Sequence, residues 1–447
     1  MKKIFQPIDN APLIVFRMFF GFLLAAETFG AILTGWVKEN FMNPEFTFSH
    51  IGMEWLQPLP GAGMYAYFSV MGILGIMVMV GYRYRLSLSL FTILWTLTYW
   101  MQKTSYNNHY YMLILVCFIM IFLPANRYAS VDAKNNLGLK SLSMPRWCSW
   151  IMILQIAIVY LFATLSKFYP DWLDGTFTKN LLAHKSPSPF IQNIFDQKWF
   201  YLFIAYSGIA FDMFIVPMLL WKRTRTLAFI ASLIFHLFNA VTLQIGIFPF
   251  FALSFALFFY PPEQIRKIFL RKKPPISDDL NPIEESKSVL LYIFLPYFVL
   301  QILLPVRHWF IEGDVLWTEE GHRLSWRMML RSRSGYTNFK VVDKKTGIQI
   351  PYNVRSKVTE KQFKTVSDKP DAIWQFAQRI KQEFAEKGTD VSIYVDSHVS
   401  INGRPPKQFI DPTVDLGTAE WNYFFHNDWI LLYDNQGNRI EKQEISK

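Results

Sequence analysis

Long apolar runs, separated by short polar or basic connectors, constrain this chain more than any other feature. Of its 447 residues 52% are hydrophobic and only 18% charged, below the roughly 25% charge usual in soluble domains. Each run has about the length needed to cross a ~30 Å hydrocarbon core. The pattern predicts a polytopic α-helical membrane protein of about nine spans, at residues 11–33, 64–81, 87–101, 110–125, 149–167, 199–221, 226–244, 245–260 and 289–306.

The seventh and eighth spans depend on how one block is divided. Residues 226–260 are apolar throughout and too long for a single upright helix. Gln244, Gly246 and Pro249 offer a break near the middle, which predicts two short helices joined by a tight turn. If this block were a single span, the membrane orientation of every later segment would be reversed.

The net charge of +11 sits mostly beside the apolar runs. Basic connectors occur at 82–86, 126–148, 222–225 and 261–288. Such clusters are typical of cytoplasmic loops that face anionic lipid, so we expect membrane lipid and no nucleic acid as a partner. With Lys2 and Lys3 inside, all four connectors are cytoplasmic, and nine spans place everything after Pro305 outside.

From Arg307 onward the composition becomes that of a soluble domain. Strand-like alternation occurs at 337–342 and 391–395, and residues 371–387 between them have helical apolar spacing. We therefore predict two parts: a transmembrane helical domain over 1–306, and a small extracytoplasmic α+β domain over 307–447.

Other chemistries have no signature in the sequence. Cys117 lies within an apolar run and Cys148 at the start of another, so no disulfide framework is indicated. The eight histidines are scattered without metal-ligand spacing, and no metal is expected. Phosphate loops, dinucleotide fingerprints and serine elbows are missing too. An enzyme of this kind would take a lipid-soluble partner from the bilayer.

Lys167, at the end of the run 150–165, is the first candidate for chemistry. Burial penalises a charged amine, so a lysine at a bilayer boundary loses its proton more readily than one in water. Asp171 and Trp172 follow closely and are its expected neighbours. The alternative is an interfacial lysine that extends its ammonium to the lipid headgroups.

Two further polar clusters lie in or beside the spans. Asn107, Asn108 and His109 precede a span on the same membrane side as Lys167 and could bind a phenolic oxygen or orient a base; alternatively, they cap a helix. His236 and Asn239 share a helix face within the seventh span; the alternative is an inter-helix hydrogen bond. Glu27 and Asp212 also fall in or near spans, with the same two interpretations.

These residues resemble the vitamin K-dependent γ-glutamyl carboxylase family. The similarity rests on ordered motifs at 107–111 with 124–132, at 166–172, at 235–239, at 325–329, and at 399–402 with 411–415. Arg327 stands where the animal pattern has an acidic residue. Animal members continue beyond the segment that matches residue 447; with the lysine-rich composition, this predicts a short bacterial member in the inner membrane, with a cytoplasmic N-terminus.

The resemblance implies a specific chemistry. A lysine at the position of Lys167 deprotonates reduced vitamin K (the hydroquinone), assisted by His109. Reaction with O₂ gives a strong base and finally the epoxide; the base removes the γ-proton of a peptide glutamate, and CO₂ adds. On this basis we assign residues to two binding roles. The quinone cofactor is expected to contact Asn107, Asn108, Tyr110, His236 and Asn239, and the glutamate-containing substrate Trp326, Arg327 and Asn402.

Two other functions remain open from the sequence. One is a quinol epoxidase that no longer carboxylates peptides. The other is a non-enzymatic membrane protein, for ligand binding or transport, whose polar intramembrane groups hold a ligand.

Overall fold

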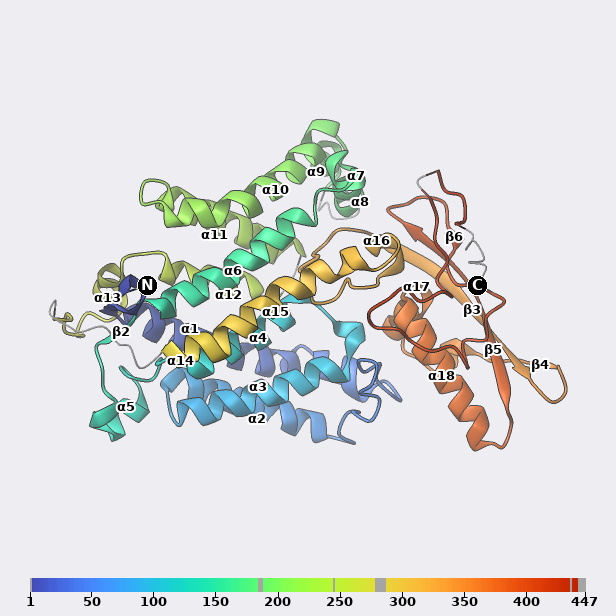
Figure 1. Ribbon diagram of the computed structural model, residues 1–447, viewed down its shortest axis with the longest axis horizontal. Helices are drawn as coiled ribbons and strands as arrows, with labels where there is room; N and C mark the ends of the chain where they lie inside the picture. The colour runs from blue at the N-terminus through green and yellow to red at the C-terminus, as the bar shows by residue number, and fades with distance from the viewer. Residues whose placement is uncertain (1, 184–187, 244–245, 278–286, 435, 441–447) are drawn as a thin grey trace.

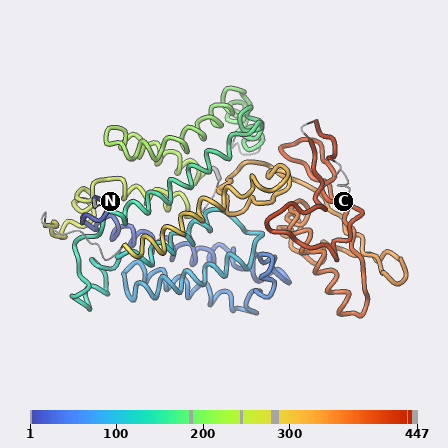
Figure 2. Tube along the Cα trace, in the orientation of Figure 1, coloured from blue at the N-terminus to red at the C-terminus, as the bar shows by residue number. Residues whose placement is uncertain are grey.

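A computed structural model describes residues 2–183, 188–243, 246–277, 287–434 and 436–440. The molecule is elongated: long helices run along its main axis, and the C-terminal sheet-containing part lies at one end (Figures 1 and 2). The N-terminus lies at the opposite end of the helical body.

Helices occupy all nine positions predicted for spans. They are α1 (Ala11–Leu33), α2 (Gly63–Val80), α3 (Tyr84–Met101), α4 (Asn108–Phe122), α6 (Trp147–Leu165), α10 (Lys198–Leu220), α11 (Arg225–Leu243), α12 (Phe248–Ser254) with η5 (Phe255–Phe258), and a run of α14 (Lys287–Val289), η7 (Leu290–Phe294) and α15 (Leu295–Val306). Among the described residues, five helices are long and apolar enough to cross a membrane: α1, α2, α6, α10 and Lys287–Phe310. The protein is thus mostly helical with five candidate spans, and the count of nine stays a prediction.

The predicted break in the block 226–260 is present. α11 ends at Leu243 and α12 begins at Phe248, with Pro249 in the first turn of α12 and Gly246 at φ +61°. Gln244 lies outside the described residues. The apolar stretches Arg225–Val241 and Phe248–Phe258 are both shorter than the five candidate spans.

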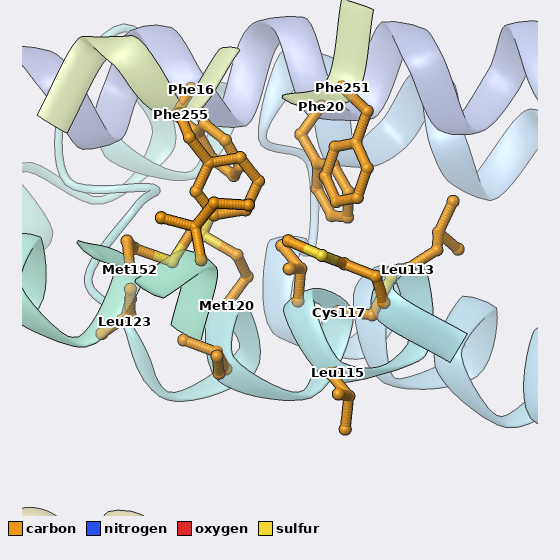
Figure 3. Close-up of a cluster of buried hydrophobic side chains, with 14 of the residues drawn as sticks. Phe16, Phe20, Leu113, Leu115, Cys117, Met120, Leu123, Met152, Phe251 and Phe255 are labelled. Carbon is orange, nitrogen blue, oxygen red and sulfur yellow. The ribbon is translucent and has the colours of Figure 1, made fainter. Parts of the chain in front are cut away.

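Small residues let the first two membrane helices approach closely. A Cβ added to Gly21 would lie 2.3 Å from the backbone nitrogen of Met79, and one added to Gly75 would lie 2.7 Å from that of Ala25. Such contacts favour helix association where water supplies no driving force. Beside them, Phe20 stacks on Phe251 with ring centroids 5.4 Å apart, in a cluster that also contains Met120 (Figure 3).

The soluble part is an antiparallel sheet covered by helices. Strand order is β4 (Gln349–Ile350), β3 (Arg333–Asp343), β5 (Val391–Ile401), β6 (Lys407–Gln408), and α17 (Glu360–Asp368) and α18 (Pro370–Glu386) pack on it. The predicted strands at 337–342 and 391–395 lie within β3 and β5, and the predicted helix 371–387 corresponds to α18. Ile373, Phe376 and Ile380 form its buried face, as the spacing indicated.

Hydrophobic packing and ion pairs join the membrane bundle to the soluble part. Phe46 and Phe48, from the connector between α1 and α2, belong to the hydrophobic cluster of the soluble part. Lys103, just after α3, pairs with Asp371 of α18 at 2.7 Å, and Arg323 pairs with the same carboxylate. Burial raises the pKa of Asp371, but Arg323 and Lys103 outweigh it and hold that pKa below its ordinary value.

A buried histidine should make the stability of the soluble part depend on pH. His426 Nδ1 lies 2.7 Å from Glu320 Oε2; burial lowers the pKa of His426, but Glu320 outweighs it and raises the pKa above its ordinary value. The pair therefore contributes its full share to the free energy of unfolding below about pH 6.5, the pKa of an unfolded histidine. That contribution is lost as the pH rises through the pKa of His426 in the folded protein. In thermal unfolding, His426→Gln should remove that part of the pH dependence; an unchanged profile would contradict the assignment.

Candidate functional site

Lys167 lies inside the protein rather than at its lipid surface. It follows the end of α6 and is 8% exposed. Its Nζ lies 2.5 Å from Asp212 Oδ2 on α10 and 3.2 Å from the carbonyl oxygen of Ala163, and the ring of Trp172 is 5.3 Å away. The ammonium is therefore held by a carboxylate from another membrane helix.

The expected neighbour Asp171 faces elsewhere. It lies in the short helix α7 (Pro170–Leu173), which turns it toward the soluble part, where it accepts hydrogen bonds from Asn402 and Arg404. Its place beside Lys167 is taken by Asp212, 45 residues further along the chain. Proximity in sequence predicted the wrong carboxylate; an isolated acid within a span was the available signal.

The rings of the two predicted histidines both contact Phe248. The ring of His109, in the first turn of α4, stacks on Phe248 with centroids 3.7 Å apart. His236 of α11 meets the edge of the same ring at 6.2 Å, and its Nε2 is 3.2 Å from the hydroxyl of Tyr160. Its Nδ1 is buried and has no hydrogen-bond partner among the described residues.

Packing connects these histidines to the lysine. Tyr160 lies on α6, seven residues before Lys167, which follows the end of that helix. Phe211, next to Asp212, contacts the rings of both Tyr160, at 5.9 Å, and His236, at 6.0 Å. The structure therefore gathers Lys167, His236 and His109 in one region of the bundle.

The polar residues around His109 have different surroundings. Asn107 caps α4 by accepting a hydrogen bond from the Tyr110 backbone at 2.8 Å, so the capping interpretation holds for this residue. Asn108 donates to the carbonyl oxygen of Arg327 at 3.3 Å. The Tyr110 side chain interacts with Glu27 of α1. Asn239 is half-buried on α11, one turn beyond His236.

Arg327 is a buried cation next to this region. It is 9% exposed; Nη1 lies 3.2 Å from His308 Nε2, and Nε has no hydrogen-bond partner among the described residues. Within that part of the chain no carboxylate lies within ion-pair distance of its guanidinium. An arginine cannot lose its charge in a protein. Arg327 is thus poised for an anion.

Trp326 and Asn402 are the other two residues predicted to contact the substrate. Trp326 is 1% exposed and stacks on Tyr111 of α4 at 4.9 Å; its indole Nε1 has no partner among the described residues. Asn402 accepts from the Ser332 backbone at 2.9 Å and donates to Asp171 at 2.7 Å. Its side chain therefore holds the end of β5 to the segment that follows Lys167.

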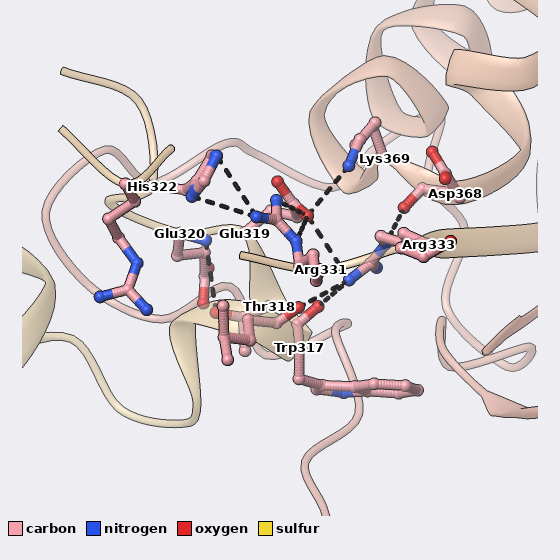
Figure 4. Close-up of polar contacts among 12 residues, drawn as sticks. Trp317, Thr318, Glu319, Glu320, His322, Arg331, Arg333, Asp368 and Lys369 are labelled. Carbon is pink, nitrogen blue, oxygen red and sulfur yellow. Dashed lines mark hydrogen bonds and ion pairs between the residues drawn. The ribbon is translucent and has the colours of Figure 1, made fainter. Parts of the chain in front are cut away.

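A charge network fixes the irregular segment between Arg327 and the start of β3. Glu319 pairs with Arg331, with Lys369 at 3.0 Å and with Arg333 at 3.6 Å (Figure 4). Burial raises the pKa of Glu319, but Arg331 and Lys369 outweigh it, so the pKa is well below its ordinary value. Because one carboxylate holds three cations here, the network is a scaffold that leaves Arg327 outside it.

The contact between Asp171 and Asn402 should stabilise the packing of the soluble part against the segment that follows Lys167. Asp171→Asn removes the negative charge to which Asn402 and the exposed Arg404 both donate hydrogen bonds. Hydrogen bonds to a buried charge contribute about 1.5–3 kcal/mol, and we expect a loss of about 1–2 kcal/mol because Arg404 is partly solvated. Thermal unfolding in detergent measures it. The control Arg404→Gln should cost less, and equal losses would place the effect on Arg404 alone.

An apolar groove lies on the helical bundle. It has a volume of about 820 Å³ and lies between α1, α12 and α13 (Pro262–Phe269), lined by Phe19, Phe22, Ala26, Ile247, Phe250 and Phe269, among others. Ile247 directly precedes Phe248, whose ring contacts both histidines. Among the described residues no group of three or more histidine, cysteine or acidic side chains is placed to hold a metal ion.

The fold and the site define an integral membrane protein with a buried lysine–carboxylate pair beneath a soluble sheet domain. Residues 5–263 match the model of the HTTM domain, and residues 286–436 match that of the vitamin K-dependent gamma-carboxylase, lumenal domain. The chain therefore belongs to the vitamin K-dependent γ-glutamyl carboxylase family. The second match supports an extracytoplasmic location for the C-terminal part. No solved structure matches the chain.

Proposed function

We propose that this protein carboxylates peptide glutamate in a reaction coupled to O₂-dependent epoxidation of vitamin K hydroquinone, with Lys167 as the base. The observation that carries the proposal is the buried contact of Lys167 with Asp212, whose neighbour Phe211 packs against His236. We assign residues 1–306 to catalysis in the membrane and 307–447 to substrate binding outside the cytoplasm.

The residues present fit a quinol with an apolar tail. The groove would hold the tail, and its end at Ile247 would bring the head group to Phe248. The ring of Phe248, which stacks on His109, would offer the quinol ring an aromatic neighbour. When bound, the quinol supplies, together with O₂, the strong base that removes the glutamate γ-proton before CO₂ adds. We assign its polar contacts to His109, His236, Asn107, Asn108, Tyr110 and Asn239.

Asp212 gives Lys167 a way to become neutral. Two isolated charges are expensive to hold in a membrane interior. A proton that moves from Lys167 Nζ to Asp212 Oδ2, 2.5 Å away, leaves a neutral amine without creating an unpaired ion. That amine can accept a proton from the quinol hydroxyl. His109 would orient the hydroxyl, and the surrounding aromatic side chains would exclude water.

Arg327 is the group we assign to the substrate carboxylate. Its guanidinium presents a planar set of donors suited to a carboxylate and lacks an anionic partner among the described residues. Trp326, next to Arg327 in the chain, has an indole NH without a partner among the described residues, and we assign it to the substrate as well. Asn402 would act by holding the adjoining segments together. Asn108 binds the Arg327 carbonyl, so the substrate and quinol sites adjoin.

One assay separates the candidate functions. The purified protein in detergent is given vitamin K hydroquinone, O₂, a glutamate-containing peptide and labelled CO₂. Epoxide together with label on the peptide supports the full proposal. Epoxide without label leaves the quinol epoxidase, and no epoxide from folded protein leaves the non-enzymatic ligand-binding or transport function.

A further inference from the structure

The soluble part carries an exposed aromatic loop, residues 422–426. Its consecutive side chains Tyr423, Phe424 and Phe425 are 53%, 76% and 69% exposed. Trp55, in the connector between α1 and α2, is 73% exposed. Large apolar side chains clustered on a surface mark an interaction site more often than ordinary solvent-facing surface.

The loop lies level with the ends of the membrane helices. Tyr423 and Phe425 line a cavity of about 210 Å³ together with Arg307, which directly follows α15, and Lys103, which comes two residues after α3. The Tyr423 hydroxyl also approaches Gly52, where an added Cβ would lie 3.4 Å from it. The loop therefore belongs to the boundary between the bundle and the soluble part.

Other aromatic side chains are exposed at the same level. Trp309 and Phe310, directly after α15, are 60% and 81% exposed. Trp100, in the last turn of α3, is 37% exposed, and its carbonyl accepts a hydrogen bond from the His50 backbone at 2.8 Å. Aromatic side chains at the ends of membrane helices are typical of the lipid–water boundary, where a ring is partly buried among headgroups.

We propose that the aromatic loop inserts into the bilayer surface on the side of the soluble part. The partner of this surface is lipid. The loop lies at the same depth as Trp309, Phe310 and Trp100, which mark the ends of the membrane helices. The soluble part is then held against the membrane by lipid contacts in addition to its attachment through α15. This inference is independent of the proposed chemistry.

Ile348 offers a matched control. It lies in the turn between β3 and β4 and is 66% exposed, an apolar side chain as open as those of the loop. The β3–β4 turn projects away from the helical body (Figure 1). A lipid contact at the loop should have no counterpart at Ile348, whereas nonspecific adsorption of the probe would affect both positions.

The test places a nitroxide spin label at Phe424→Cys, Phe425→Cys or Ile348→Cys in the full chain. Cys117 and Cys148 are both buried, and the parent chain measures any labelling of them. The proteins are reconstituted into phosphatidylcholine vesicles containing phosphatidylglycerol. Power saturation then compares the accessibility of each label to O₂, which partitions into lipid, with that to a water-soluble nickel chelate.

Lipid insertion predicts a higher ratio of O₂ to nickel accessibility at positions 424 and 425 than at 348. Equal ratios would overturn the proposal and leave the loop in water. Low accessibility to both reagents at 424 and 425 would also overturn it, because the loop would then be covered by protein, such as a second copy of the chain.

Discussion

Lys167→Ala should abolish epoxide formation from vitamin K hydroquinone while the protein remains folded. Removal of a general base typically costs about 10²–10⁴-fold in rate, and here no other amine lies beside Asp212 among the described residues. In this variant Asp212 can become neutral by taking up a proton, so no unpaired charge is left buried in the bundle. Epoxide release per minute by purified protein, with unfolding temperature in parallel, measures the two effects separately.

Two control variants define the role of the amine. Lys167→Arg keeps a cation for Asp212, yet a guanidinium stays charged and cannot accept a proton, so this variant should be as inactive as Lys167→Ala. Lys179→Ala removes an exposed lysine from the nearby helix α8 (Thr176–Leu182) and should retain wild-type rates. Activity in Lys167→Arg close to that of the wild type would exclude proton abstraction by Lys167 and leave it a structural ion-pair partner.

Local chemistry was enough to predict most of the helices and to single out a few of the buried polar residues, among them Lys167, Asp212 and His236. Apolar runs must become helices in lipid because the backbone has no other way to satisfy its hydrogen bonds. The amphipathic spacing of 371–387 likewise determines which face of α18 meets the sheet. Lys167 and His109 stood out because polar groups within apolar segments are costly and need a reason.

Partner choice could not be predicted from the same sequence. Lys167 pairs with Asp212 rather than the nearer Asp171, because the short helix α7 redirects the chain after Tyr169. The contact between Asn108 and Arg327 joins residues 219 positions apart. Phe46 and Phe48 join the core of the soluble part from a connector between membrane helices. Each of these depends on how distant segments pack, which apolar periodicity does not encode.

α3 is not among the five candidate spans although it lies within the bundle. Serine and threonine side chains and its basic start lower its mean hydropathy. The hydroxyls of Thr92 and Thr98 donate hydrogen bonds to the carbonyl oxygens four residues back, at 2.7 and 3.0 Å. Such internal bonding lowers the cost of a polar side chain in lipid.

Arg327→Gln should separate the two half-reactions. If its guanidinium binds the glutamate carboxylate, loss of that charge should weaken peptide binding by about 2–5 kcal/mol, the usual cost of truncating one partner of a buried, hydrogen-bonded charge pair. We expect the KM for peptide to rise by at least about 30-fold, by the conversion of 1.4 kcal/mol per factor of ten. Epoxide formation without peptide should change little, since Lys167 and Asp212 are untouched. Labelled CO₂ on the peptide and epoxide release are measured in the same reaction.

The companion variants assign the effect to the planar guanidinium. Arg327→Lys keeps a point charge without the two-pronged geometry and should recover only part of the peptide affinity. Arg355→Gln, at an exposed arginine of the soluble part, should behave as wild type. An equal loss of epoxidation and carboxylation in Arg327→Gln would mean that this cation supports the quinol site, which it reaches through Asn108. The glutamate would then have to find its counter-ion elsewhere, and the replacement of the acidic residue of animal members by Arg327 would reflect a change at the quinol rather than at the peptide.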